Sequence, residues 1–210
     1  YDVYGSISEL EDDVPLDYVI IAVPAKLTPS ILEQCGQKGV PFVTIFTSGF
    51  SEVGNKHLEE KLLEIAEKHN IRLLGPNCLG VFVPEIKLSF ALTLLKDTSG
   101  KLGMIFQSGG LAVYVSAMAQ SVYGVNPSKV ISIGNQIDLN FVDFLDYFHT
   151  DKNTEIIALY LENIKSQRIG RKFFQSVKKL SQAGKPVILW KVGTGEAAKE
   201  AIMSHTGGLA

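Results

Sequence analysis

Short apolar segments alternate with longer amphipathic segments along most of the chain. The apolar segments are hydrophobic on both alternating faces, which is typical of strands covered by helices on both sides. The predicted strands are 18–23, 42–46, 71–74, 102–106, 130–133, 155–161 and 186–191, and the predicted helices are 28–38, 56–69, 111–122, 141–148 and 172–182. Strand, helix and strand at this spacing predict right-handed crossovers and parallel pairing. The pattern therefore indicates an α/β fold built from doubly wound parallel sheets.

The alternation weakens between residues 84 and 100, where neither a helical nor a strand period persists. This interruption predicts a domain boundary. We expect a first domain over residues 1–94 and a second domain over residues 95–210.

Two helix starts have recognisable signals. Thr28 is expected to cap the helix that has Pro29 at its first position. The strand 102–106 is followed by Gln107 and then by Ser108, Gly109 and Gly110. These last three residues have little side-chain bulk, so several backbone amides could converge at the positive end of the next helix. Such a turn suits a phosphate, although Ser-Gly-Gly alone is also common in plain strand-to-helix turns.

Composition and charge exclude several classes of partner. The net charge is −2 and no long basic cluster occurs, so nothing favours nucleic acid. No apolar run reaches the ~20 residues of a membrane span. Cys35 and Cys78 have no metal-ligand spacing and do not form a secreted disulfide framework. We therefore expect a cytoplasmic protein with no membrane partner and no metal site in this chain.

Candidate binding residues follow the predicted strands, where open parallel sheets collect their ligands. Thr47 and Ser48 follow one strand of the first half, and Val23 and Pro24 another; plain turns are the alternative reading. The other candidates at such positions are Asn77 and Asn135, whose amides offer a donor and an acceptor, and Glu162.

His205 lies among small residues in Ser-His-Thr-Gly-Gly, with no apolar side chain beside it. An imidazole is partly unprotonated at neutral pH and can attack phosphorus, but a surface histidine without a role is an equal alternative. A phosphorylated histidine needs donors for the phosphoryl oxygens and an acceptor that orients its ring. Ser108–Gly110 and Glu162 are the candidates for these two tasks.

Several motifs resemble, in order, those of the NDP-forming acyl-CoA synthetases, which include ADP-forming acetyl-CoA synthetase and, more distantly, the α subunit of succinyl-CoA synthetase. The similar segments are 75–80 (GPNCLG), 107–111 (QSGGL), 132–135 (SIGN), 160–162 (YLE) and 204–210 (SHTGGLA). The resemblance implies a CoA-binding Rossmann-like domain, here without its first βαβ unit, followed by a flavodoxin-like ligase domain.

The resemblance also implies a reaction and roles for residues. Acyl-CoA, phosphate and NDP are converted reversibly to acid, CoA and NTP through an acyl phosphate and a phosphohistidine. His205 matches the phosphohistidine and Glu162 the carboxylate that orients it, whereas Ser108, Gly109 and Gly110 match the phosphate-binding helix start. Contacts to CoA fall on Val23, Pro24, Thr47 and Ser48, and Asn77 and Asn135 lie near the acyl group and phosphate.

The implied partners include an ATP-grasp module, on a β subunit or fused, which binds ADP or ATP with Mg²⁺. An oligomer is expected, and the chain alone is expected to be incomplete for turnover. Two alternatives remain: a non-catalytic CoA- or effector-binding module beside a protein acetyltransferase, and a succinyl-CoA synthetase α subunit, whose usual Gly-His-Ala-Gly motif differs from the one here.

Overall fold

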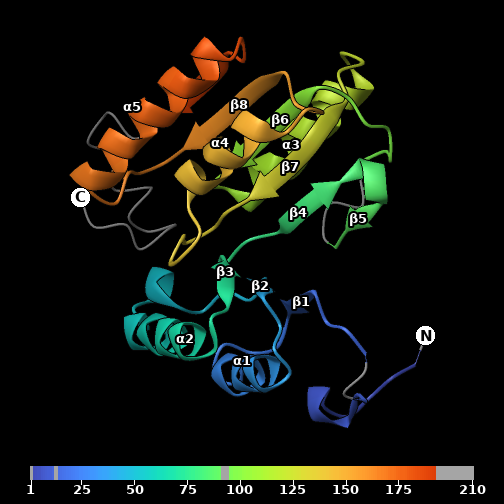
Figure 1. Cartoon of the computed structure of the whole chain (residues 1–210), viewed down its shortest axis with the longest axis vertical. Coiled ribbons are helices and arrows are strands. Elements are labelled where there is room, and N and C mark those ends of the chain that lie inside the picture. Colours follow the sequence, from blue (N-terminus) through green and yellow to red (C-terminus); the bar gives the residue numbers. More distant parts are fainter. Residues whose placement is uncertain (1, 12–13, 91–94, 193–210) are drawn as a thin grey trace.

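The computed structural model describes residues 2–11, 14–90 and 95–192. Within these ranges the chain forms a three-stranded and a six-stranded sheet with helices packed on them (Figure 1). The strands are β1 (Tyr18–Ile21), β2 (Phe42–Ile45), β3 (Arg72–Leu74), β4 (Gly80–Val83), β5 (Leu88–Ser89), β6 (Leu102–Phe106), β7 (Pro127–Ser132), β8 (Ile156–Leu161) and β9 (Val187–Lys191). The α-helices are α1 (Thr28–Gln37), α2 (Lys56–His69), α3 (Gly109–Ser121), α4 (Phe141–Thr150) and α5 (Gln167–Gln182), and the 3-10 turns are η1 (Ile7–Glu9), η2 (Ser51–Val53) and η3 (Pro84–Ile86).

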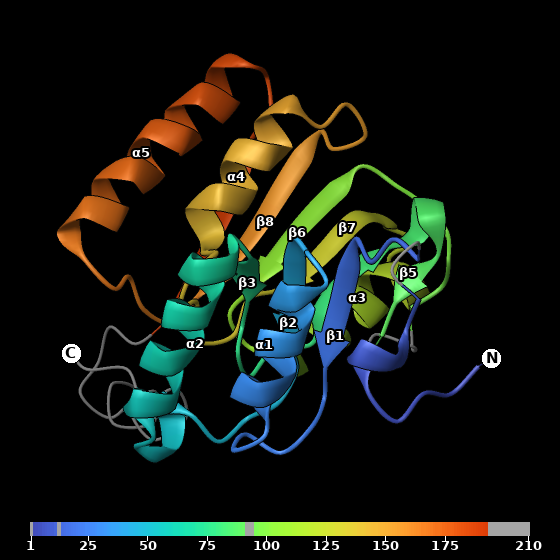
Figure 2. The same cartoon turned by 60° about the horizontal axis from the view of Figure 1, so that its bottom comes forward.

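The first sheet is parallel, in the order β1-β2-β3. Because the strand order follows the chain, both crossovers pass on the same side, and α1 and α2 cover one face of this sheet (Figure 2). Their apolar sides, which include Leu32 and Leu62, pack on Ile21, Val43 and Ile45 in one buried cluster. The described part of this sheet is therefore covered by helices on one face, which differs from the doubly wound arrangement that the sequence predicts.

The second sheet has the order β5-β4-β7-β6-β8-β9 and is parallel from β7 to β9. Helices α4 and α5 cover one face and α3 covers the other (Figures 1 and 2). Side chains alternate along each strand, so Ile105 and Ile131 pack toward α4, whereas Met104 and Val130 pack toward α3. This half is doubly wound, as the sequence predicts.

Two strands join the second sheet from earlier in the chain. Strand β4 pairs antiparallel with β7, and β5 pairs antiparallel with β4. Both strands precede residue 94, so the second sheet takes strands from both sides of the proposed boundary. The division into residues 1–94 and 95–210 stays a prediction.

The segment after β7 joins the two sheets because it runs antiparallel to the end of β3. Leu139 N donates to Leu73 O at 3.1 Å, and Ile137 N donates to Gly75 O at 3.2 Å. At the same junction Asp138 accepts two hydrogen bonds of 3.0 Å from the guanidinium of Arg72. The carboxyl ends of strands from both sheets consequently face one region of the molecule.

Candidate functional site

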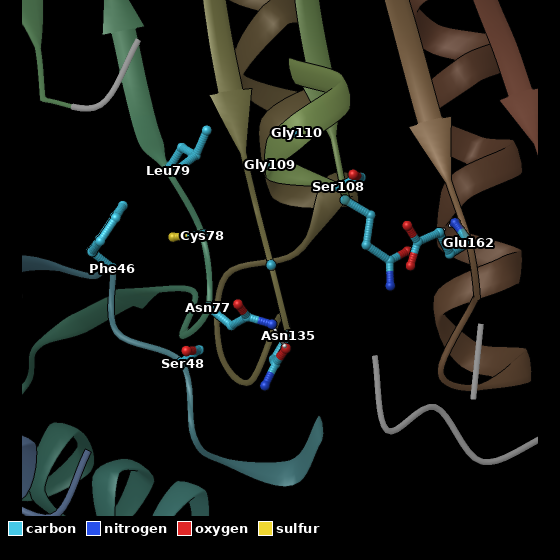
Figure 3. Close-up of a pocket in the computed structure, with 12 residues that line it drawn as sticks. Phe46, Ser48, Asn77, Cys78, Leu79, Ser108, Gly109, Gly110, Asn135 and Glu162 are labelled. Atoms are coloured by element: carbon cyan, nitrogen blue, oxygen red, sulfur yellow. Dashed lines mark hydrogen bonds between the residues drawn. The ribbon is translucent and has the colours of Figure 1, made fainter. Parts of the chain in front are cut away.

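A cavity of about 350 Å³ lies where the carboxyl ends of strands from both sheets meet (Figure 3). Residues that follow β2, β3, β6, β7 and β8 form its wall. The lining residues are Phe46, Ser48, Asn77, Cys78, Leu79, Gln107, Ser108, Gly109, Gly110, Gly134, Asn135 and Glu162. Most of the candidates that follow predicted strands are thus brought together.

The first turn of α3 forms one wall of the cavity. Ser108 is the N-cap, and its Oγ accepts a hydrogen bond of 3.4 Å from Leu111 N. A Cβ atom at Gly109 would lie 2.9 Å from Leu79 Cγ, whereas a Cβ at Gly110 would meet no atom within 4 Å. The first turn contains no acidic residue. The positive end of the helix therefore faces the cavity without a carboxylate of its own, which suits an anion.

Gln107 connects this helix start to the end of β8. Its side chain is buried, and its Oε1 accepts hydrogen bonds from Glu162 N at 3.0 Å and Asn163 N at 3.2 Å. These bonds fix the backbone that presents Glu162. Sequence reasoning gave Gln107 no role of its own, although its place directly after a buried strand was a signal for one.

Glu162 lines the cavity on the side opposite Phe46 (Figure 3). The residue is 7% exposed, and its carbonyl oxygen accepts a hydrogen bond of 2.8 Å from Lys191 Nζ. Burial, the negative charge of Glu162 and a hydrogen bond with the Glu162 side chain all raise the pKa of Tyr160 above its ordinary value. The phenol consequently stays protonated and acts as a neutral neighbour of the carboxylate.

Asn77 and Asn135 lie side by side on the floor of the cavity, with Asn77 Nδ2 3.4 Å from Asn135 Oδ1 (Figure 3). Asn77 adopts a left-handed conformation with φ of 57°. The amide nitrogen of Asn135 lies 2.6 Å from Glu52 Oε2 and 2.8 Å from Glu59 Oε1, and it donates hydrogen bonds to these carboxylates. Asn135 therefore ties the second sheet to η2 and α2.

Glu52 and Glu59 are partners that sequence reasoning missed. Burial acts to raise the pKa of Glu52, but hydrogen bonds from Gly49 N, Asn135 and Phe50 N outweigh it and hold the pKa below its ordinary value. Glu59 is 7% exposed and lies on the same face of α2 as Leu62 and Ala66. A carboxylate within an apolar helical stripe was the signal that could have found it.

The four residues predicted to contact CoA lie in the turns after β1 and β2. Ser48 lines the cavity, and Thr47 Oγ1 donates a hydrogen bond of 2.6 Å to Val23 O. Pro24 is exposed in the first of these turns. The two turns are thus joined beside the cavity, and the CoA contacts stay a prediction.

Cys78 is part of the cavity wall and is 3% exposed. Burial raises the pKa of its thiol to about 12, and Sγ donates to Ile45 O at 3.6 Å. The thiol is therefore neutral and contributes an apolar surface. Among the described residues, no group of three or more His, Cys, Asp or Glu side chains is placed to hold a metal ion.

His205 lies outside the described residues. Its proximity to Glu162 and to the start of α3 stays a prediction. Helices of the described part are each too short or too polar to cross a membrane.

Comparisons with known proteins decide the family. Residues 99–210 match the family described as a succinyl-CoA ligase like flavodoxin domain. The chain belongs to this succinyl-CoA ligase-like family. Residues 1–84 match a second family, described as a CoA binding domain. The predicted order of a CoA-binding domain followed by a succinyl-CoA ligase-like flavodoxin domain is confirmed.

Related members of the succinyl-CoA ligase-like family are named as ADP-forming ligases. An acetate–CoA ligase [ADP-forming] from Methanocaldococcus jannaschii is 42% identical over 207 residues, which are 99% of this chain and 28% of that protein. The acetate–CoA ligase [ADP-forming] I subunit alpha of Pyrococcus furiosus is 40% identical over 212 residues, covering 100% of this chain and 44% of the relative.

A solved structure agrees with this relationship. The dinucleotide forming acetyl-coenzyme A synthetase 1 of Ca. Korarchaeum cryptofilum, in complex with phosphate and ADP, superposes with a TM-score of 0.89 at 36% identity. The match covers 100% of this chain and 44% of that structure. The present chain thus spans less than half the length of each of these three relatives.

Proposed function

We propose that the chain is the CoA-binding and phosphate-transferring part of an NDP-forming acyl-CoA synthetase. The observation that supports this most is the convergence of the acid-free start of α3, buried Glu162 and the Asn77 amide on one cavity. The relatives support it as well, since their names describe ADP-forming ligases of acetate and 4-hydroxybutyrate.

The reaction proceeds in three transfers. A phosphate oxygen attacks the thioester carbonyl carbon, and the CoA thiolate leaves, which gives an acyl phosphate. An imidazole nitrogen of His205 then attacks phosphorus, and the carboxylate leaves as the free acid. NDP finally takes the phosphoryl group from the histidine, which gives NTP and regenerates the imidazole. Each transfer breaks one bond and forms one bond, so no oxidant or reductant is needed.

Residues of this chain have separate tasks in these transfers. Amides of Ser108, Gly109 and Gly110 hold the phosphoryl oxygens at the positive helix end. Glu162 accepts a hydrogen bond from the N–H of the second ring nitrogen of His205 and so orients the ring. The turns that contain Val23, Pro24, Thr47 and Ser48 bind CoA.

The nucleotide and its Mg²⁺ belong to an ATP-grasp module on a partner subunit or in a further part of the same chain. Two relatives support these two arrangements. One is named a subunit alpha, which supports a separate partner subunit, and the other is a longer ligase without a subunit name, which supports a fused chain. The assembly is an oligomer in the cytoplasm. A succinate–CoA ligase subunit alpha is a more distant relative at 28% identity, which favours an acetate-type enzyme over a succinate-specific one.

Labelling of the complete enzyme with radioactive phosphate and acetyl-CoA tests the proposal. The wild-type protein is expected to retain label that is stable in base and labile in acid, and His205→Ala is expected to retain none and to lose more than about a hundredfold in turnover. His149→Ala, at the last turn of α4, is the matched control and keeps the label. Unchanged labelling of His205→Ala, or a wild-type protein that binds acetyl-CoA but takes up no label, contradicts the proposal; the second result favours the effector-binding alternative.

A further inference from the structure

Glu52 lies between two parts of the site that come from different sheets. It belongs to η2, directly after the turn that follows β2, and its side chain reaches Asn135, which follows β7. One carboxylate oxygen, Oε1, accepts hydrogen bonds from Gly49 N at 2.5 Å and Phe50 N at 3.1 Å. The other oxygen, Oε2, accepts a hydrogen bond of 2.6 Å from Asn135 Nδ2. The two oxygens of one carboxylate are therefore bonded to two different parts of the site.

We propose that Glu52 is a positioning residue that orients the Asn135 carboxamide for acyl transfer from CoA to phosphate and couples it to the turn that binds CoA. This inference rests on the proposed function, since it assigns a further residue to the same cavity. Glu52 is not among the residues that line the cavity. It acts on the reaction through Asn135 and Asn77.

The backbone at Asn135 is fixed by the loop that follows β3, which leaves only the direction of its side chain open. Asn135 N donates a hydrogen bond of 2.9 Å to Pro76 O. A Cβ atom at Gly134 would lie 2.2 Å from the same oxygen, so the two loops approach as closely as a glycine allows. Asn135 is 6% exposed. A buried carboxamide here can be turned in two ways, and its hydrogen-bond partners select one of them.

Two carboxylates select the orientation of the Asn135 amide. Its nitrogen carries two hydrogens, and Glu59 Oε1 at 2.8 Å occupies the second donor position beside Glu52. An amide oxygen in place of the nitrogen would face two negative charges, which excludes the turned orientation. The Asn135 oxygen is thereby directed toward Asn77 Nδ2 at 3.4 Å.

The orientation of Asn135 is passed on to Asn77, which lines the cavity. Because the nitrogen of Asn77 faces the Asn135 oxygen, the Asn77 oxygen is turned away from Asn135 (Figure 3). An acceptor at this place suits the single O–H of hydrogen phosphate, and it leaves the unprotonated oxygens to the amides at the start of α3. A turned Asn135 would bring nitrogen against nitrogen and release Asn77 from this orientation.

Glu52 and Glu59 differ in how many of their oxygens carry these bonds. Glu59 uses one oxygen, Oε1, to accept from both Asn135 Nδ2 and Ser51 Oγ at 2.8 Å. Glu59→Gln can therefore keep both bonds through its single oxygen. Glu52→Gln cannot, since donors face both of its oxygens. Its one remaining oxygen stays with the two turn amides, because that orientation keeps two bonds, and its nitrogen meets the nitrogen of Asn135.

Two routes to the phosphohistidine, compared in the complete enzyme with Glu52→Gln, test the inference. Labelling from acetyl-CoA and radioactive phosphate requires the acyl transfer, whereas labelling from ATP with a radioactive γ-phosphate does not. The acetyl-CoA route is expected to slow by at least about tenfold, while KM for acetyl-CoA stays within about twofold because the turn keeps its bonds. The ATP route is expected to stay within about twofold. A general loss of structure would slow both routes.

Three further variants separate the bridge from the charge. Glu59→Gln is expected to slow the acetyl-CoA route by no more than about threefold. Glu52→Asp keeps the charge but is one methylene too short to reach both sides, so it is expected to lose at least about tenfold, and it serves if Glu52→Gln does not fold. Glu60→Gln, whose side chain is exposed on α2, is the control that keeps the wild-type rates.

Several results would overturn the role of Glu52. These are a smaller loss than about tenfold on the acetyl-CoA route in the folded Glu52 variants, equal losses on both routes, a rise in KM for acetyl-CoA alone, or a loss beyond about threefold in Glu59→Gln. A wild-type enzyme that takes up no label by either route overturns the proposed function instead.

Discussion

Helices α3 and α4 each begin after a neighbouring strand of the second sheet, yet their first turns differ in chemistry. Helix α4 has a complete capping box, in which Asn140 Oδ1 accepts from Val142 N and Asp143 Oδ2 accepts from Asn140 N. Helix α3 has only the Ser108 cap, two glycines and no acid in its first turn. The comparison teaches that α4 neutralises its own positive end, whereas the first turn of α3 has no acid of its own, which is what the proposed phosphate site requires.

The largest expected effect comes from giving α3 an acid like that of α4. In Gly110→Asp the new side chain has space, because a Cβ there meets no atom within 4 Å. The carboxylate repels phosphate and is expected to raise KM for phosphate roughly tenfold or more. The same charge stabilises the helix start, so the melting temperature stays equal or rises slightly. Steady-state kinetics and a thermal melt of the complete enzyme measure both.

Gly110→Asn is the matched control, since it has the same shape without the charge. It is expected to change KM for phosphate by a small factor only. Equal losses in the Asp and Asn variants assign the effect to shape and remove the start of α3 as the anion site.

Much of this fold could be predicted because its signals are local. The strand 102–106 and the helix 56–69 have the predicted bounds, since each is a continuous apolar segment or a complete amphipathic period. The Thr28 cap is wrong: Leu27 occupies the cap position with helical angles, and Thr28 is buried within the first turn. A threonine before proline suits either position, and only packing against the sheet decides between them.

The candidate site was predictable in part for a similar reason. The rule for the ends of parallel strands brought Ser108, Asn77 and Glu162 together without any knowledge of the pairing. The contacts of Asn135 could not be predicted, because Glu52 and Glu59 come from segments more than 70 residues earlier. Likewise, β4 joins the second sheet through antiparallel pairing with β7, which no local period specifies.

The second prediction concerns the other end of α4, where Asp151 is the C-cap. Its carboxylate lies 2.8 Å from Lys129 Nζ, and the two side chains are only 9% and 10% exposed. In Asp151→Asn the ammonium of Lys129 stays buried without its counter-ion, which is expected to cost about 3 kcal/mol of unfolding free energy. Urea unfolding of the complete enzyme measures the loss, and Lys101→Met is the control because its pair with Glu155 is exposed.

The stabilisation from Asp151 has a defined pH dependence. Burial acts to raise the pKa of Asp151, but hydrogen bonds from Lys129, Thr154 and Asn153 outweigh it and hold the pKa below its ordinary value. A folded-state pKa below the unfolded value means that the stabilisation is complete above about pH 5 and is lost as the pH falls through the folded-state pKa. The gap between wild type and Asp151→Asn is therefore expected to shrink in acid. A gap that widens there contradicts the ion pair.

The smallest effect is expected from making the start of α4 resemble that of α3. Asp143→Ala removes the carboxylate that accepts from Asn140 N and leaves the rest of the cap in place. The loss is expected to be about 1 kcal/mol, and hydrogen exchange is expected to accelerate at the first-turn amides of α4. Asp143→Asn keeps an acceptor oxygen and is expected to lose about half as much. Because α4 starts outside the cavity, KM for phosphate is expected to stay unchanged in both Asp143 variants. If KM for phosphate instead rises in these variants as much as in Gly110→Asp, the start of α4 also affects phosphate binding, and the two helix starts do not act separately.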